Sequence, residues 1–193
     1  MATMGVRDLF VAKCNQENPM DSETYEDPKR IAKAIKVELT TEVAEGILYA
    51  DDGADVIVKE FVSGELKIEA NDISDADEAE LLGQELDKDG VSYGSGDDNA
   101  PYWAVGFRAK RPDGKFRYVW LFKTKFGIPD EAYDTKASGI TFNTPKLVGK
   151  IIKRDSDGRW RAKYTGMPTD SVAAGWFAEV REFEEKSAEP VTP

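Results

Sequence analysis

Carboxylates are the side chains of this sequence that offer most for chemistry. Asp51, Asp52 and Asp55 lie in a glycine-containing stretch, and three aspartates so close together could bind a cation. The stretch lacks the EF-hand pattern, however, and acidic turns of this kind are common, so a solvated loop is the simpler interpretation. The other paired carboxylates lie in acidic runs without apolar neighbours that would raise one pKa. A glycosidase-like pair of acid and base is therefore not indicated.

The sequence also disfavours histidine-based catalysis, disulfide formation and phosphate binding by a glycine-rich loop. The chain has no histidine, which removes the commonest general base and metal ligand. Its one cysteine, Cys14, cannot form an internal disulfide, and this is typical of a reducing cytoplasm. Gly94-Ser95-Gly96 follows no clear strand and precedes no helix, as a phosphate loop would require. We expect neither an enzyme nor a bound cofactor or metal. We also expect no secretory signal and no membrane span.

Basic residues gather in the second half of the chain, around Tyr102, Trp103 and Trp120. The candidate interface cations are Arg108, Lys110, Arg111, Lys115, Arg117, Lys123, Lys125, Arg159, Arg161 and Lys163. Cations interleaved with aromatic rings are typical of surfaces that bind single-stranded nucleic acid. Cations and rings fall mostly on opposite faces of the second strand, so the aromatic face is better interpreted as core and the basic face as an outer or interface surface.

The element that must position these residues is a β-hairpin over 101–126. Trp103, Val105 and Phe107 alternate along its first strand, and a second apolar row follows the turn at 111–115. That row consists of Phe116, Tyr118, Trp120, Phe122 and Phe126, with Thr124 as its polar member. Pro112 and Gly114 suit the corners of a tight turn.

The remaining pattern predicts about seven to nine strands and one helix. Strands are expected at 8–13, 30–40, 55–61, 65–70, 139–153, 159–165 and 173–180, with a hairpin turn at 155–158 and loops at 41–55 and 87–100. The helix is expected from Ser74 to Leu86, because Ser74 can cap it and Ala79, Leu82 and Leu86 form an apolar stripe. The predicted fold is mainly β (α+β), a β-sandwich or partly open barrel with one flanking helix.

Charge divides the chain into an acidic and a basic half. The net charge is −11, and residues 42–98 carry 3 Lys/Arg against 18 Asp/Glu. Residues 101–163 carry 15 Lys/Arg against 6 Asp/Glu. These halves could be two solvated surfaces, or the acidic part of one copy could meet the basic part of the next. Such a head-to-tail contact generates rings or open stacks.

Several sequence blocks cover most of the chain, in order, from about residue 28 to 180. They are 48–55, 58–61 with Gly64, 105–110, 118–121, 125–129, 140–145 and 175–177. Together these blocks resemble the major tail proteins of long-tailed bacteriophages that infect Gram-positive bacteria.

The resemblance implies a virion structural protein with a fold like that of phage tail tubes and the type VI secretion tube. Six copies would form a ring, and stacked rings would conduct double-stranded DNA, which passes transiently and non-specifically. The other partners would be tail proteins such as the tape measure, terminator and distal tail proteins. The protein would reside in the virion tail, and in the host cytoplasm during assembly. Alternatives are another tail ring component (a terminator or baseplate-proximal ring), or a single-stranded nucleic-acid binding β-module.

Within this interpretation we expect an N-terminal arm and loop at 1–27, a tail tube domain at 28–181 and a mobile tail at 182–193. An acidic lumen would repel phosphate and keep the duplex centred. The candidate lumen-facing residues are Asp51, Asp52, Asp55, Glu65, Glu69, Asp72 and Asp75.

Overall fold

The computed structural model describes residues 2–16, 22–50, 53–131 and 144–184, with only the backbone described at 49–50 and 53–55. The protein is mainly β, with one large antiparallel sheet and few helices, as predicted. In chain order the elements are β1 (Val6–Asn15), β2 (Thr24–Tyr25), β3 (Lys29–Ala32), β4 (Ala34–Ala50), β5 (Gly53–Ala70), α1 (Asp75–Leu82), β6 (Glu85–Leu86), β7 (Ser92–Tyr93), β8 (Tyr102–Lys110), β9 (Phe116–Gly127), β10 (Lys146–Ile152), β11 (Arg161–Gly166) and α2 (Ser171–Ala174).

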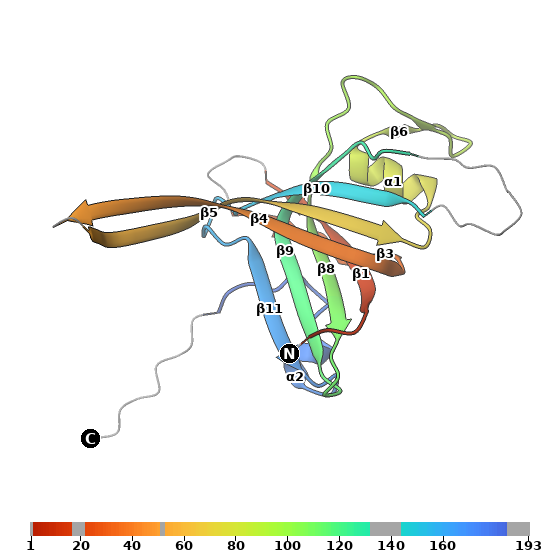
Figure 1. The fold of residues 1–193 in the computed structure, drawn as a ribbon. Coiled ribbons are helices and arrows are strands. Elements are labelled where there is room, and N and C mark those ends of the chain that lie inside the picture. Colours follow the sequence, from red (N-terminus) through yellow and green to blue (C-terminus); the bar gives the residue numbers. More distant parts are fainter. Residues whose placement is uncertain (1, 17–21, 51–52, 132–143, 185–193) are drawn as a thin grey trace, which may run out of the picture.

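The large sheet has a branch at β9. Its main order is β2-β1-β8-β9-β10-β5-β4, while β11 also pairs with β9 and β3 pairs with β1. One edge of β9 pairs with β8, and the other edge is shared, by β11 along 116–121 and by β10 along 123–127. Figure 1 shows β4, β5 and β10 crossing over β1, β8, β9 and β11, so the branched sheet folds into two layers.

The space between the two layers holds the main apolar core. At most 1% of the surface is exposed for Leu66 and Ile68 in one layer and for Val105 and Leu121 in the other. Helix α1 contributes Leu81 to the same core and thereby closes one end of it. This arrangement is the partly open barrel with one flanking helix that the sequence predicts.

A second apolar cluster covers the outer side of β1, β8 and β9. Trp120 is completely buried there, and its indole N–H donates to the carbonyl of Trp176 at 2.8 Å. Gly106 lies directly opposite Trp120 on β8, and a Cβ at that position would approach the indole ring to 2.7 Å. The segment that provides Trp176 and Phe177 contains the short helix α2, so the strand predicted at 173–180 is wrong.

The predicted hairpin at 101–126 is confirmed, but its aromatic row does not lie on one face. Phe122 and Trp120 belong to the outer cluster, whereas Phe126 belongs to the core between the layers. The register between β8 and β9 shifts between Trp103 and Val105, where β9 has one extra residue. This bulge reverses the alternation, and β9 is buried on both faces.

Helix α1 is shorter than the sequence predicts. Its N-terminus is confirmed, because the Ser74 hydroxyl accepts from the Asp77 amide at 3.2 Å and donates to the Asp77 carboxylate at 2.7 Å. It ends at Gly83, which has a left-handed φ of 73°. Leu86 therefore lies in β6 with 43% of its surface exposed, not on the apolar stripe of the helix.

Three further predictions are corrected by the strand pairings. The predicted loop at 41–55 continues β4 and β5, which run unbroken into one long hairpin. The predicted loop at 87–100 contains β7, which pairs with β6. The turn at 155–158 is present, with the Arg154 amide bonded to the Arg159 carbonyl, but the strands on either side both pair with β9 and not with each other.

The ends of the chain are described in part. Strand β1 lies inside the sheet between β8 and the short strands β2 and β3, so much of the segment predicted as an N-terminal arm is sheet. The part of the 139–153 strand prediction that covers 139–143 lies outside the described residues, and β10 begins at Lys146. The boundaries of the predicted tail tube domain, at residues 28 and 181, stay predictions.

The burial of Trp120 leads to a stability prediction. Replacing Trp120 with alanine removes a completely buried indole and leaves the Trp176 carbonyl without its donor, so unfolding should cost about 3–5 kcal/mol less than in the wild type. Denaturant titration followed by circular dichroism measures this difference. Tyr93→Ala is the matched control, since Tyr93 is 58% exposed and its loss should change stability by less than about 0.5 kcal/mol. Equal midpoints for both variants would contradict the assignment of this face to the core.

Candidate functional site

The most prominent surface feature is the outer part of the β4–β5 hairpin, residues 42–50 and 53–62, which we call the projecting hairpin. Figure 1 shows it extending away from the two-layered body. At about 3.3 Å per residue, its nine β4 residues reach roughly 30 Å. Every residue at 42–48 and 56–60 is exposed.

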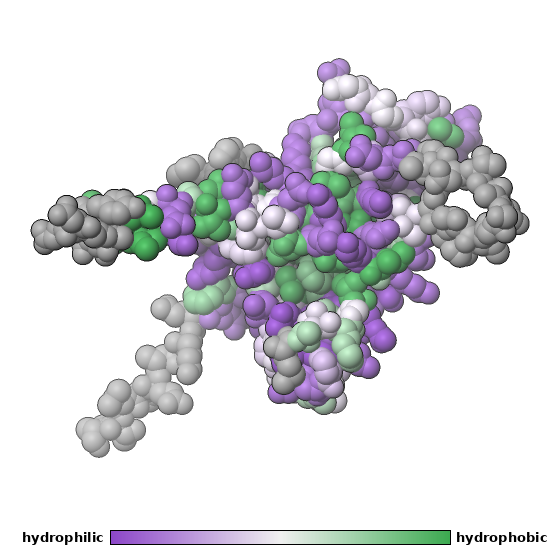
Figure 2. All heavy atoms as spheres, viewed as in Figure 1, coloured by the Kyte–Doolittle hydropathy of each residue, from purple (hydrophilic) through white to green (hydrophobic). Residues whose placement is uncertain are grey.

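Apolar side chains lie on both faces of the projecting hairpin. Antiparallel partners share a face, so Ile47 and Ile57 lie on one face, and Leu48 and Val56 lie on the other. Exposed fractions reach 56% for Ile57 and 60% for Leu48. Figure 2 shows green apolar groups beside purple polar ones along the projection. A two-stranded hairpin is at best marginally stable in water, so such a surface favours a partner on each face.

The base of the projecting hairpin is anchored by aromatic stacking. The rings of Phe61 and Trp160 are parallel within 1°, with centroids 4.3 Å apart. The Arg161 guanidinium lies 4.3 Å from the centroid of the Trp160 ring. Since Val43 pairs with Phe61, one apolar face of the projection runs directly onto this stack.

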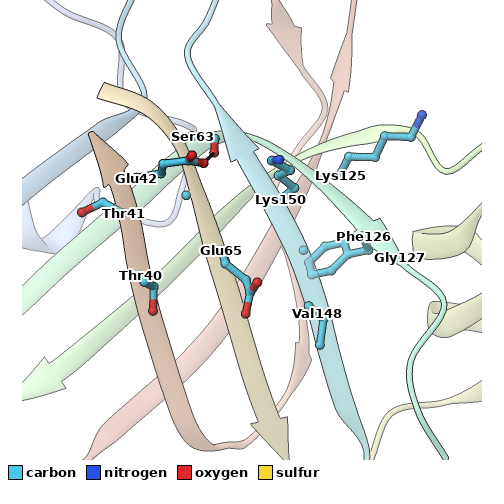
Figure 3. Close-up of a pocket in the computed structure, with 12 residues that line it drawn as sticks. Thr40, Thr41, Glu42, Ser63, Glu65, Lys125, Phe126, Gly127, Val148 and Lys150 are labelled. Atoms are coloured by element: carbon cyan, nitrogen blue, oxygen red, sulfur yellow. Dashed lines mark hydrogen bonds between the residues drawn. The ribbon is translucent and has the colours of Figure 1, made fainter. Parts of the chain in front are cut away.

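A groove of about 660 Å³ lies where the projecting hairpin leaves the body (Figure 3). Its walls come from β4, β5, β9 and β10 and contain Glu42, Glu65, Lys125 and Lys150. Glu42 accepts from the Ser63 hydroxyl at 2.9 Å, and Glu65 pairs with Lys67 at 2.6 Å. The groove thus places one hydroxyl beside one carboxylate, and its mixed lining of lysines, carboxylates and a phenyl ring suits binding.

The acidic residues predicted for a lumen are not gathered on one described face. Glu65 and Glu69 point outward from β5, while Asp72 and Asp75 lie between β5 and α1 and at the helix start. The side chains of Asp51, Asp52 and Asp55 lie outside the described residues. Lysines share the outward face with Glu65 and Glu69, because strand pairing places Lys150 beside Glu65 and both Lys36 and Lys146 beside Glu69. That face therefore has mixed charge.

The predicted basic residues also separate into different environments. Lys123 is corrected most strongly, because it is only 3% exposed and cannot serve an interface. Arg108 is half-buried and pairs with Asp8 at 2.5 Å. Arg159 pairs with Asp157 at 3.0 Å, while Lys115 is exposed at the β8–β9 turn. Lys125 donates to the Asn99 side chain at 2.7 Å. Trp103 and Trp120 are buried, so they are unavailable to stack on bases.

Lys123 is the centre of a buried ionic cluster at the branch of the sheet. Its ammonium contacts Glu23 at 3.3 Å and Asp155 at 2.6 Å, and it donates to Gln16 at 2.9 Å. Burial opposes ionisation of Glu23, but hydrogen bonds from Ser156, the Asp155 amide and Lys123 outweigh it and lower the pKa of Glu23 to about 2. The cluster thus joins the segment after β1 to the turn between β10 and β11.

A second groove, of about 400 Å³, opens at the gap between the two layers. In the described part of the chain β4 pairs only with β5, and β11 only with β9, so the sheet stays open between them. We call this gap the seam groove. Its floor is apolar, with Ile35, Val37, Leu39, Phe107 and Val119, and its rim carries Lys36, Arg117, Arg161 and Lys163.

The cations Arg117, Arg161 and Lys163 of the seam groove form no ion pair with any described residue. The Arg117 Nε is buried and lacks a hydrogen-bond partner. Burial lowers the pKa of Arg161, and the nearby Arg117 guanidinium lowers it further. The groove is therefore a basic site whose charges repel one another within a single copy.

Within the described ranges, no three carboxylate or cysteine side chains converge as ion ligands. No helix in the same part of the chain is long and apolar enough to cross a bilayer.

The projecting hairpin and the seam groove are two candidate surfaces that sequence reasoning missed. Gly46, Gly53 and the aspartates suggested a loop, although Asp52-Gly53 is also a hairpin turn signal and the flanking segments are apolar. A longer window over 43–62 could have found the hairpin. No local signal could have found the groove, because its residues come from strands far apart in the sequence.

The buried ionic cluster leads to a pH prediction. Glu23 has a folded pKa of about 2 against an ordinary value of 4.5, so its stabilising contribution is complete above pH 4.5 and is lost as the pH falls toward 2. Glu23→Gln should lower stability by about 3 kcal/mol at pH 7. Its deficit relative to the wild type should shrink between pH 5 and pH 3. Urea titration at each pH measures both, with the exposed Asp27→Asn as control. A deficit that stays constant down to pH 3 would contradict the role of the charge.

Comparison with models of known protein families found no match to this chain, and comparison with curated proteins found none either.

Proposed function

We propose that this chain is a tail tube subunit of a long-tailed bacteriophage, which forms hexameric rings that stack into a tube for DNA. The projecting hairpin is the observation that supports this most. Its exposed apolar residues lie on both faces, far from the body, and a monomer in water leaves them uncovered. A subunit that reaches into its neighbours would bury them.

The open edges of the sheet favour the same conclusion. Strand β4 spans 17 residues and, in the described part, has a partner on one edge only. A long unpaired edge is a template for pairing with another chain. In a closed ring each such edge would have a partner, which agrees with the ring of six copies that the resemblance implies.

The distribution of charge supports a head-to-tail contact between copies. The β8–β9 turn and β11 carry Lys115, Arg161 and Lys163, whereas the segment from α1 to β7 is mainly acidic. Figure 1 places α1 and β6 at one end of the body and the β8–β9 turn with α2 at the other. Complementary ends on one molecule generate stacks.

The acidic charge expected for the lumen stays a separate prediction. The outward face of β5 and β10 mixes Glu65 and Glu69 with lysines. If that face lines the tube, the duplex would meet alternating charges with little net attraction, in place of the acidic wall that the sequence predicts.

Assembly by the projecting hairpin is testable with one double variant. Ile57→Lys with Val58→Glu places a charge on each face of the hairpin. Both side chains are more than half exposed, so the melting temperature should stay within a few degrees of the wild type. Negative-stain microscopy of the concentrated wild type should show rings or tubes, and the variant should show none.

The matched control exchanges an ion pair on the same hairpin. Glu45 and Lys59 are bonded at 3.0 Å, and Glu45→Lys with Lys59→Glu keeps the pair and the apolar residues. This variant should assemble like the wild type. A wild type that stays monomeric at high concentration would overturn the proposed function. Tubes formed by the Ile57→Lys, Val58→Glu variant would show that the projecting hairpin is not needed for assembly.

A further inference from the structure

The seam groove has the chemistry of a binding site for an acidic segment that carries apolar side chains. Its floor consists of Ile35, Val37, Leu39, Phe107 and Val119, and Ile35 is 51% exposed. Arg117, Arg161 and Lys163 stand along one rim without ion-pair partners among the described residues. The Arg117 Nε is buried without a hydrogen-bond acceptor, so a ligand that offers an acceptor there would satisfy it.

A segment with the complementary chemistry is present on the same chain, at residues 84–98, which we call the acidic hairpin. It contains β6 and β7 and carries five carboxylates against one lysine. Leu86, Val91 and Tyr93 are exposed on it by 43%, 50% and 58%. Its shape is set in advance, because the Asp87 carboxylate accepts from the amides of Asp89 at 2.8 Å and Val91 at 2.9 Å.

The acidic hairpin of a copy cannot reach the seam groove of that same copy. Figure 1 shows β6 beside α1 at one end of the body, whereas β11, which bears Arg161 and Lys163, lies toward the opposite end. We propose that the seam groove binds the acidic hairpin of a second copy and so forms the contact between successive rings. This inference rests on the proposed tail tube function.

This pairing would bury exposed apolar side chains of the acidic hairpin and neutralise the rim cations of the seam groove. Leu86, Val91 and Tyr93 would leave water for the apolar floor, while carboxylates would meet the three rim cations. The repulsion that Arg117 exerts on Arg161 would be offset by the incoming negative charge. Because groove and hairpin are different surfaces, the contact is heterologous and continues from copy to copy.

Charge reversal with mixing tests the contact. The groove variant carries Arg161→Glu and Lys163→Glu, and the hairpin variant carries Glu85→Lys and Asp89→Lys, which leave the Asp87 side chain in place. Each variant alone sets like charges against like and should need at least about tenfold higher concentration to assemble. An equimolar mixture should recover assembly, because the acidic groove of one variant then faces the basic hairpin of the other. Sedimentation velocity and negative-stain microscopy measure assembly, and circular dichroism checks folding.

A control with the same charge change separates net charge from position. Lys146→Glu with Lys153→Glu reverses two exposed cations outside the seam groove and should assemble like the wild type. If the wild type forms tubes and the groove variant forms them equally well, the inference fails while the proposed function stands. Variants that fold and lose assembly but are not restored by mixing also contradict it. A wild type that never assembles overturns the inference together with the proposed function.

Discussion

The change of partner along one edge of β9 is the constraint on which the rest of the structure depends. Up to Leu121 that edge pairs with β11, and from Lys123 onward it pairs with β10. The bulge at this point turns the chain and buries Lys123, whose charge must then be met by Glu23 and Asp155. The two layers, the core between them and the seam groove all follow from the sheet dividing here.

The sequence was sufficient for those parts of the fold in which local pattern and tertiary structure agree. The hairpin of β8 and β9 follows from alternation and the Pro-Asp-Gly turn, and the start of α1 follows from the Ser74 cap. Prediction was wrong where tertiary contacts override the local pattern. Phe126 changes sides because of a bulge, and Leu86 leaves the helix because Gly83 ends it. Residues 173–180 lack a strand because their aromatic rings cover an existing cluster.

The candidate surfaces were harder to predict than the core. Cation counts alone could not separate Lys123, which is buried in the sheet branch, from Arg161, which borders an open groove. The two lie on neighbouring strands, but Lys123 is shielded from solvent, whereas Arg161 has no carboxylate partner among the described residues. Likewise, the acidic residues of β5 acquire lysine neighbours from β4 and β10 that are distant in sequence.

The unbroken course of β4 and β5 from the body into the projecting hairpin has a mechanical consequence. The two strands cover 34–50 and 53–70, and the β5 segment at 64–69 is also bonded to β10. Hydrogen bonds of an antiparallel ladder lie perpendicular to the strands, so a pull on one strand along its axis loads many of them together in shear. Tension on the projection is thus carried into the core by the shared ladder, and the register shift between Glu42 and Val43, where the projection leaves the body, marks the point at which it can bend.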